Sequence, residues 1–474
     1  MEAAQEARAQ SSGDADERAM WPGRPRQDHS KAHFTSWAGA RGRFSGSVMK
    51  RAWARWRSVL VAGALFGCSG TDEATRAPLV ELFSWWTKPG EVEALDAVLA
   101  VHEQRHPGAK VINAAAKDSA SARDRLRTRL EDREPPDTFQ ANVGQDLLRW
   151  VLYNGADASE SKLEPLDGKA IVGRDFRDVF PETVLSAAGF AGQVYAVPVN
   201  IHRTNSLFYN KQVFADLGVV VPESLDELYA VSDQLMEHGV VPLAVGAKGS
   251  WTLALLFFEN LLIAKEGVTF YDDYFAGRVD AADPRVLEVL DESLRLWRYT
   301  NSDARQIEWD AAVAMVHDGR AAMTVMGDWA KGTLEQLGGV PGKTFGQVPF
   351  PGTAGVFVFT ADTFPLPKGA PRRKDALDFL GTLASLEGQN AFNPIKGSIP
   401  ARTDIDPAAY DVLARAMIKD FRRDTLELAL SGLAPATFND YVQAGLGDMV
   451  DQQNPEPARF ALMNRYDILQ ATNR

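Results

Sequence analysis

The sequence predicts an α/β fold that is divided into more than one domain. Strand and helix patterns alternate over residues 79–140, which indicates a mostly parallel sheet with helices on its faces. Two strand patterns in direct succession, residues 193–200 and 206–210, then interrupt the alternation. The length of 474 residues also exceeds that of one ordinary domain. We therefore expect a crossing between two domains near residues 200–204.

Residues 79–91 organise the first domain. Residues 79–84 alternate as a strand, Trp85 and Trp86 follow where that strand should end, and Pro89 and Gly90 separate them from a helix that begins at Glu91. Ligands of open α/β sheets lie beyond the carboxyl ends of the strands. An indole has an apolar face and one N–H donor at its edge, which suits a pyranose sugar. Both rings could instead pack in the core.

The remaining elements follow from periodicity and from capping residues. Ser224 and Glu227 form a capping box, and Asp283 before Pro284 is an N-cap. The patterns predict further strands at 110–114, 138–140, 241–246, 321–326 and 356–359. They predict helices at 91–105, 121–130, 225–238, 252–265, 284–299, 309–320 and 374–386, then an extended segment at 393–402 and helices to the end.

The strand at 321–326 repeats the arrangement seen at Trp85. It ends in Gly-Asp-Trp-Ala-Lys, so that Trp329 lies just beyond a strand end with the carboxylate of Asp328 beside it. Two separate parts of the chain therefore place an indole where a ligand would bind.

The charge distribution argues against a nucleic-acid partner. The net charge is −12, but residues 1–67 hold 11 Lys and Arg against 6 Asp and Glu, a balance of +5 that leaves −17 for the rest. Binding to a phosphate backbone requires a basic surface.

The basic N-terminus has the form of an export signal. Met49 begins a basic region, residues 58–66 are apolar but too few to span a bilayer, and Cys68 follows Gly67 in a pattern that resembles a lipobox. Cys68 is the only cysteine, which excludes an internal disulfide or a multi-cysteine metal site. We expect a non-native or disordered extension (1–48), a signal peptide (49–67), and a tether (68–78) that begins with a lipidated Cys68. A small buried residue is the alternative for Cys68.

Five segments carry a resemblance to a known family: residues 83–91, 136–140, 197–202, 315–331 and 396–402. In this order they resemble the extracellular solute-binding proteins of sugar ABC transporters, the family that includes maltose-binding protein, and within it the glucose- or mannose-type proteins. The likeness spans residue 79 to the C-terminus.

The resemblance implies the type II periplasmic-binding-protein fold, in which two α/β lobes are joined by hinge crossovers and close around a ligand in the cleft between them. It implies an N-terminal lobe of residues 79–200 with 361–396, and a C-terminal lobe of residues 201–360 with 397–474. The resemblance also implies two further crossings between the lobes, near residues 359–363 and 396–402. Glucose-type proteins often have a histidine after the Phe-Gln pair, and here the matching position is Asn142, whose amide can donate and accept.

The candidate ligand-binding residues are of two kinds. The candidate stacking rings are Trp85, Trp86, Trp251 and Trp329. The polar candidates, which can hydrogen-bond to hydroxyl groups, are Glu91, Gln140, Asn142, Asn200, His202, Asp328 and Lys396. Core packing could account for any one ring, and a solvated loop for any one polar residue. His202 could instead be a hydrogen-bonded hinge residue.

The sequence and the resemblance together favour a periplasmic lipoprotein that captures a monosaccharide or short oligosaccharide and delivers it to the permease of an ABC importer. We expect a monomer without cofactor or metal. Two alternatives stay open: an exported carbohydrate-active enzyme that uses the carboxylates Glu91 and Asp328, and a ligand sensor without transport. The sequence has no His-Glu-x-x-His zinc motif, no Gly-x-Ser-x-Gly elbow and no Gly-rich phosphate loop.

Overall fold

The computed structural model describes residues 79–114, 119–153 and 157–472, which fall within one compact unit, Thr71–Arg474. The predicted extension, signal peptide and tether, with Cys68, lie outside these residues. In the described part of the chain, no helix combines the length and apolarity that crossing a membrane requires.

The helices are α1 (Glu91–Arg105), α2 (Ser119–Glu131), α3 (Gln145–Val151), α4 (Gly168–Val172), α5 (Glu182–Ala187), α6 (Lys211–Leu217), α7 (Leu225–Glu237), α8 (Trp251–Leu253), α9 (Asn260–Glu266), α10 (Val268–Phe275), α11 (Pro284–Trp297), α12 (Trp309–His317), α13 (Trp329–Gln336), α14 (Arg373–Ala384), α15 (Leu386–Lys396), α16 (Val412–Arg423), α17 (Leu430–Leu433), α18 (Ala436–Gln452) and α19 (Glu456–Thr472).

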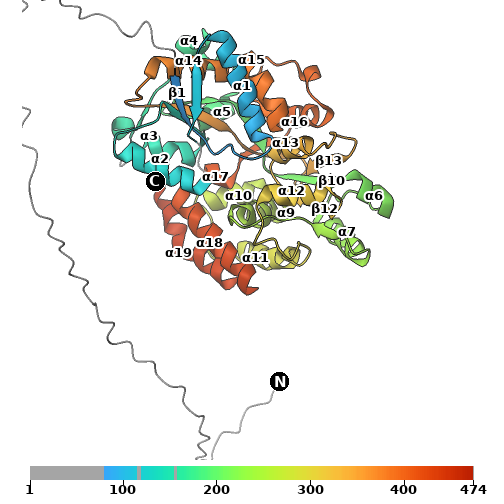
Figure 1. Cartoon of the computed structure of the whole chain (residues 1–474). Helices are drawn as coiled ribbons and strands as arrows, with labels where there is room; N and C mark the ends of the chain where they lie inside the picture. Colours follow the sequence, from blue (N-terminus) through green and yellow to red (C-terminus); the bar gives the residue numbers. More distant parts are fainter. Residues whose placement is uncertain (1–78, 115–118, 154–156, 473–474) are drawn as a thin grey trace, which may run out of the picture. The chain divides into compact units, whose positions relative to one another are not determined.

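The first sheet confirms the predicted strand–helix alternation. Its central strand β1 (Leu79–Phe83) pairs in parallel with β2 (Lys110–Asn113) and β3 (Thr138–Phe139). Figure 1 shows β1 in the upper part of the molecule beside α1 and α14. A companion sheet is organised by β15 (Asp362–Pro367), which pairs antiparallel with β4 (Ala141–Asn142), β5 (Leu163–Glu164) and β8 (Ala196–Pro198). Together these sheets support the first hydrophobic core.

A second core surrounds another sheet, whose strands are ordered β11 (Val241–Leu243), β12 (Ala321–Val325), β10 (Ser206–Asn210) and β13 (Phe345–Pro349). Strand β10 runs antiparallel to β12 and β13, while β11 runs parallel to β12. Residues of α7, α9, α10, α11 and α18 fill this core, and most of these helices appear in the lower part of Figure 1. The predicted capping box at Ser224 and N-cap at Asp283 are both confirmed.

A four-stranded sheet joins the two cores. Its order is β16 (Ile399–Pro400), β9 (Asn200–Arg203), β14 (Val356–Thr360) and β17 (Thr425–Leu428). Successive side chains of a strand point to opposite faces. Accordingly, Phe357 and Phe359 of β14 lie in the first core, and Val358 lies in the second.

The three predicted crossover segments contribute to this sheet, since β14 and β16 each pair with β9. Helix α16, which the predicted lobe division places in the C-terminal lobe, packs Ala414, Met417 and Ile418 into the first core. The boundaries of the two lobes stay a prediction.

Two sequence-based expectations were wrong in detail. The predicted strands end at residue 200 and begin again at residue 206, but residues 201–203 belong to β9, because β14 and β16 pair with it on either side. Residues 393–396 were expected to be extended, but they form the last turn of α15, which ends at Gly397 in the left-handed conformation with φ 92°. The cost of Pro394 within this helix is offset by tertiary bonds: the Asn393 amide donates to the carbonyl oxygen of Val199 and accepts from Ser398.

The apolar helix predicted at 252–265 contains a π-helical turn, Ala254–Glu259, between α8 and α9. The buried carboxylate of Glu259 accepts hydrogen bonds from Thr204 Oγ1 (2.7 Å), the Leu430 amide (2.6 Å) and the Tyr271 hydroxyl (3.4 Å). Burial raises the pKa of Glu259 to about 7, against the opposing effect of these bonds. Glu259 therefore ties the second core to Thr204, which directly follows the crossover strand β9.

We predict that Glu259 makes the fold less stable as the pH rises. The folded chain keeps the Glu259 proton up to about pH 7, whereas a glutamate of ordinary pKa loses it near 4.5. The free energy of unfolding should therefore fall between these values by up to about 3 kcal/mol from this group. Glu259→Gln removes the titration, so its stability relative to wild type should improve steadily over this range in urea unfolding.

Glu103→Gln, at an exposed position of α1, is the matched control and should show no such trend. A stability difference between Glu259→Gln and wild type that is independent of pH would contradict the prediction.

Candidate functional site

The loop between β1 and α1 places two adjacent indoles in different environments. The ring of Trp85 is half-buried at the edge of the first core, and its backbone N–H donates to Gln140 Oε1 at 3.2 Å. Trp86 is only 2% exposed and packs against Phe364 and Phe392 at centroid distances of 5.4 and 4.7 Å. The core covers the ring of Trp86 in this structure, and its stacking on a ligand stays a prediction.

Trp329 lies at the start of α13, where the sequence pattern placed it. Its half-buried ring meets Trp251 at 6.1 Å between centroids and the edge of His202 at 5.2 Å. The ammonium group of Lys396 lies 5.9 Å from the Trp329 ring centroid. Trp251 and Trp329 both pack against the second core. The structure thus brings together four of the predicted residues.

His202 lies between two buried carboxylates. Its Nδ1 contacts Asp328 Oδ1, and its Nε2 lies 3.1 Å from Asp362 Oδ2. Asp362 also accepts from Gln140 Nε2 at 2.7 Å and from Asn200 Nδ2 at 2.8 Å. The second oxygen of Asp328 accepts the backbone N–H that follows His202 at 3.0 Å. Four predicted polar residues therefore form one network around His202, which we call the His202 cluster: Gln140, Asn200, His202 and Asp328, together with Asp362.

Electrostatics determine the charge of the imidazole. Burial acts to lower the pKa of His202, but its interactions with Asp328 and its hydrogen bond with Asp362 outweigh burial and raise that pKa. Burial would raise the pKa of Asp362, but the hydrogen bond and charge of His202 lower it to about 2. His202, Asp328 and Asp362 thus form a triad in which the two carboxyl groups favour the charged form of the imidazole.

Glu91 and Lys396 form a second charged pair beside this triad. Lys396 Nζ lies 3.2 Å from Glu91 Oε1, and both side chains are buried. The other Glu91 oxygen accepts the backbone N–H groups of Thr87 and Lys88, each at 3.2 Å, in front of α1. A carboxylate is stabilised at the N-terminus of a helix. The two carboxylates that a glycosidase would need, Glu91 and Asp328, are thus each engaged by a cation.

Asn142 is half-buried on β4, in register with Asp362 of β15. Asp362 is not among the predicted site residues, although it lies in the predicted crossing at 359–363. A buried carboxylate cannot be recognised in such a segment from sequence alone, since most polar segments between strands are solvated. Among the described residues, no group of histidine, cysteine, aspartate or glutamate side chains is arranged to hold a metal ion.

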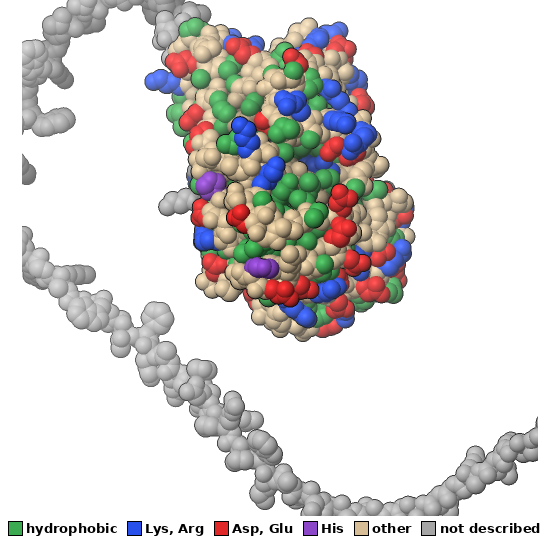
Figure 2. All heavy atoms as spheres, turned by 90° about the vertical axis from the view of Figure 1, so that its right-hand side faces the viewer, with side chains coloured by type: hydrophobic (Ala, Val, Ile, Leu, Met, Phe, Trp, Pro, Cys, Tyr) green, Lys and Arg blue, Asp and Glu red, His purple; other side chains and the backbone are tan. Residues whose placement is uncertain are grey.

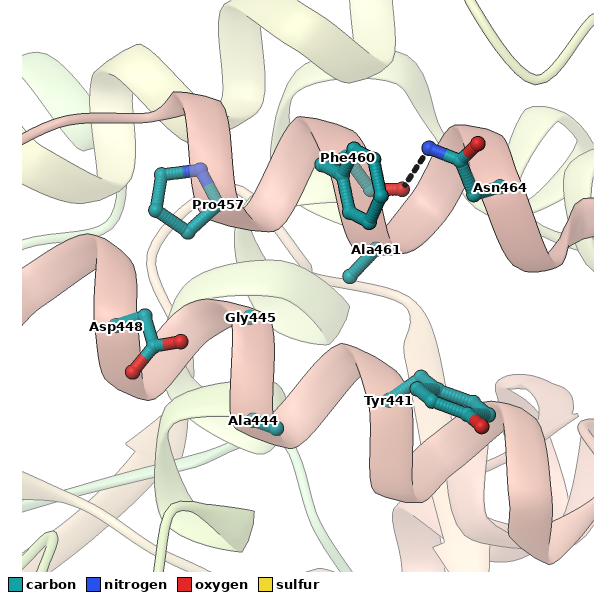
Figure 3. A pocket seen from close by; sticks show the side chains of 8 residues that line it. All are labelled: Tyr441, Ala444, Gly445, Asp448, Pro457, Phe460, Ala461 and Asn464. Atoms are coloured by element: carbon teal, nitrogen blue, oxygen red, sulfur yellow. Dashed lines mark hydrogen bonds between the residues drawn. The ribbon is translucent and has the colours of Figure 1, made fainter. Parts of the chain in front are cut away.

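A hollow of about 400 Å³ lies elsewhere, between α18 and α19 (Figure 3). Gly445 makes the close contact of these helices possible, because a Cβ atom built there would lie 2.7 Å from Ala461 Cβ. None of the predicted ligand-binding residues lines this hollow, which is formed by Tyr441, Ala444, Gly445, Asp448, Pro457, Phe460, Ala461 and Asn464.

Comparison with known proteins identifies the family. A family model for bacterial extracellular solute-binding proteins matches residues 81–390. The chain belongs to this family. A Pyrococcus horikoshii protein described as an ABC transporter extracellular-binding protein is 33% identical to this chain over 413 residues. The match covers 83% of this chain and 91% of the relative. A Rhizobium meliloti protein described as a sugar-binding periplasmic protein is 32% identical over 350 residues, covering 73% and 82%.

Solved structures confirm the fold of this chain. A bacterial solute receptor described as preferring β-D-galactopyranose superposes with a TM-score of 0.72 at 18% identity, covering 84% of this chain and 100% of the receptor. A chitin oligosaccharide binding protein gives the same TM-score at 18% identity, covering 83% and 99%. The predicted two-lobed α/β fold is therefore confirmed.

The free energy of unfolding of single variants distinguishes the environments of the adjacent indoles Trp85 and Trp86. Trp86→Ala removes a fully packed ring and should lower the free energy of unfolding by about 3 to 5 kcal/mol. Trp85→Ala removes a half-buried ring and should cost at most about 2 kcal/mol. Urea unfolding followed by circular dichroism measures both values. Equal losses, or a larger loss for Trp85→Ala, would show that the environments of the two rings are assigned incorrectly.

Proposed function

We propose that this solute-binding protein captures a monosaccharide or short oligosaccharide and delivers it to an ABC importer. The observation that carries the proposal is the placement of three half-buried indoles around a charged and polar cluster: Trp85 packs against the first core, while Trp251 and Trp329 pack against the second. Rings from two cores can cover the two faces of a pyranose, and polar side chains can bond its hydroxyl rim. Relatives described as sugar-binding periplasmic proteins support the same ligand class.

The proposed ligand contacts are of two kinds. The rings of Trp85, Trp251 and Trp329 would stack on the sugar. Polar contacts would come from residues at the edges of the His202 cluster and of the Glu91–Lys396 pair. The proposed polar residues are Glu91, Gln140, Asn142, Asn200, His202, Asp328 and Lys396.

Binding would be coupled to a change in the arrangement of the lobes. A sugar that contacts rings on both lobes binds more tightly when the lobes are closed, and only this difference in affinity can shift the equilibrium toward the closed form. The permease would then recognise the closed form. Export to the periplasm and anchoring through a lipidated Cys68 complete the proposal, in which the chain acts as a monomer and catalyses no reaction.

The surface in Figure 2 fits such a role. Acidic and basic side chains are mixed on this face, and no continuous basic area covers it. A face of this kind offers no surface for binding a phosphate backbone, which agrees with the acidic balance of the chain after residue 67.

Titration with a panel of mono- and oligosaccharides tests the function. We expect one class of sugar to change the tryptophan fluorescence in a saturable way and to raise the melting temperature of the chain from Ser69 onward. Trp329→Ala should weaken binding by about tenfold or more, because it removes a stacking surface. Trp297→Ala, at a half-buried position of α11, is the control and should bind normally.

The sugar should also be recovered unchanged. Chromatography after prolonged incubation would reveal cleavage products and thereby favour an enzyme. The absence of any response to sugars, in a chain shown to be folded, would contradict the sugar assignment.

A further inference from the structure

We propose that Asp362 is a positioning residue that holds Gln140, Asn200 and His202 of the site in one arrangement. Together with Asp328 it forms a clamp, two carboxylates that hold His202 between them as an imidazolium. The role of this clamp in ligand binding rests on the proposed function. The clamp itself is a property of the chain without ligand, so the two can be tested separately.

Three side chains of the cluster contact the Asp362 carboxylate. Its carboxylate is buried, with the residue 5% exposed, and Oδ1 accepts from Gln140 Nε2 at 2.7 Å. Oδ2 accepts from Asn200 Nδ2 at 2.8 Å and from His202 Nε2 at 3.1 Å. The backbone N–H of Asp362 donates to Asn200 Oδ1 at 2.8 Å, which fixes the orientation of that amide. One residue thus orients three predicted ligand contacts.

The backbone around Asp362 is held from both sides. Asp362 begins β15 immediately after the crossover strand β14, and its carbonyl oxygen accepts the N–H of Val199 at 3.0 Å. The preceding carbonyl oxygen, of Ala361, accepts the N–H of Val143 at 3.1 Å. The backbone at this position cannot shift without breaking the pairing of β15 with β4 and β8. The side chain is therefore suited to set the positions of its partners.

Two buried carboxylates flank the His202 ring and favour a proton on each ring nitrogen, in competition with the Asn200 amide nitrogen, which lies 2.9 Å from Nε2 and could donate to it. Nδ1 faces Asp328 and Nε2 faces Asp362, and each carboxylate oxygen can only accept. A neutral imidazole has one N–H and could donate to only one of the two carboxylates; Asp362 would keep its bonds from Gln140 and Asn200, and Asp328 would keep its bond from the Arg203 backbone. The other charged groups near the ring are Lys396, which opposes the positive charge, and Arg203, whose guanidinium pairs with Asp420 at 2.9 Å. The carboxylates on both sides hold the imidazolium in place.

The ring nitrogens of His202 can be observed directly by NMR in the purified chain labelled with ¹⁵N-histidine, with the signals assigned through His202→Asn. In the ligand-free wild type, both nitrogens should be protonated at about pH 7.5, above the ordinary histidine pKa of about 6.5. A neutral His202 ring under these conditions would overturn the proposal, and this arm needs no substitution in the cluster.

The variant Asp362→Asn keeps the shape of the side chain and removes its charge. We expect the His202 ring to lose its proton at a pH at least about one unit lower than in wild type. Asp404→Asn is the matched control, because Asp404 pairs with Arg402 and Arg174 and is partly exposed. It should leave the titration of His202 unchanged. An unchanged titration in Asp362→Asn would likewise overturn the clamp.

The binding arm uses whichever sugar saturates the wild-type chain. Asp362→Asn should weaken its binding by about tenfold or more and make the affinity depend on pH as His202 titrates. In the double variant with His202→Asn, this pH dependence should disappear and the two losses should not add, because both substitutions break the same unit. Additive losses would contradict the positioning role. If no sugar binds to the wild type, the proposed function fails, while the NMR result still decides the clamp.

Discussion

The burial of three charged groups in one place is the constraint on which the rest of the site depends. His202, Asp328 and Asp362 are all buried, and the transfer of a charge from water costs several kcal/mol unless it is paired and hydrogen-bonded. The three residues come from the crossover strand β9, from the start of α13 and from the start of β15. Their charges are paired only when these elements meet. We infer that the cluster selects one arrangement of the two cores, with the half-buried indoles on either side of it.

Close backbone contacts make that meeting possible. A Cβ atom on Gly332 of α13 would lie 2.5 Å from the carbonyl oxygen of Ile395, and one on Gly90, before α1, would lie 2.8 Å from the backbone of Gly332. The neighbouring Lys331 is buried and pairs with Glu335 at 2.6 Å and Asp411 at 2.8 Å. Glycine is needed here because the helix ends approach more closely than side chains allow. The charged groups can then reach one another across the junction.

Sequence reasoning predicted the elements better than it predicted burial. The alternation around β1 and the caps at Ser224 and Asp283 depend on local chemistry, so they could be predicted, as could the position of Trp329 just beyond the strand β12. What could not be predicted depended on tertiary contacts. The ring of Trp86, unlike that of its neighbour Trp85, is covered by Phe364 and Phe392, which lie far from it in the sequence. Asp362 could not be recognised as buried because the three side chains that contact its carboxylate, Gln140, Asn200 and His202, lie far from it in the sequence.

A double-mutant cycle between His202 and Asp328 tests the central claim most directly. His202→Asn, Asp328→Asn and the double variant would be compared with wild type by the free energy of unfolding in urea, without ligand. Each single substitution removes one member of the His202–Asp328 pair and leaves the other buried without this contact, whereas the double substitution removes both members. The account predicts a coupling energy of at least about 2 kcal/mol. Effects that add to within about 0.5 kcal/mol would show that the two charges do not support one another.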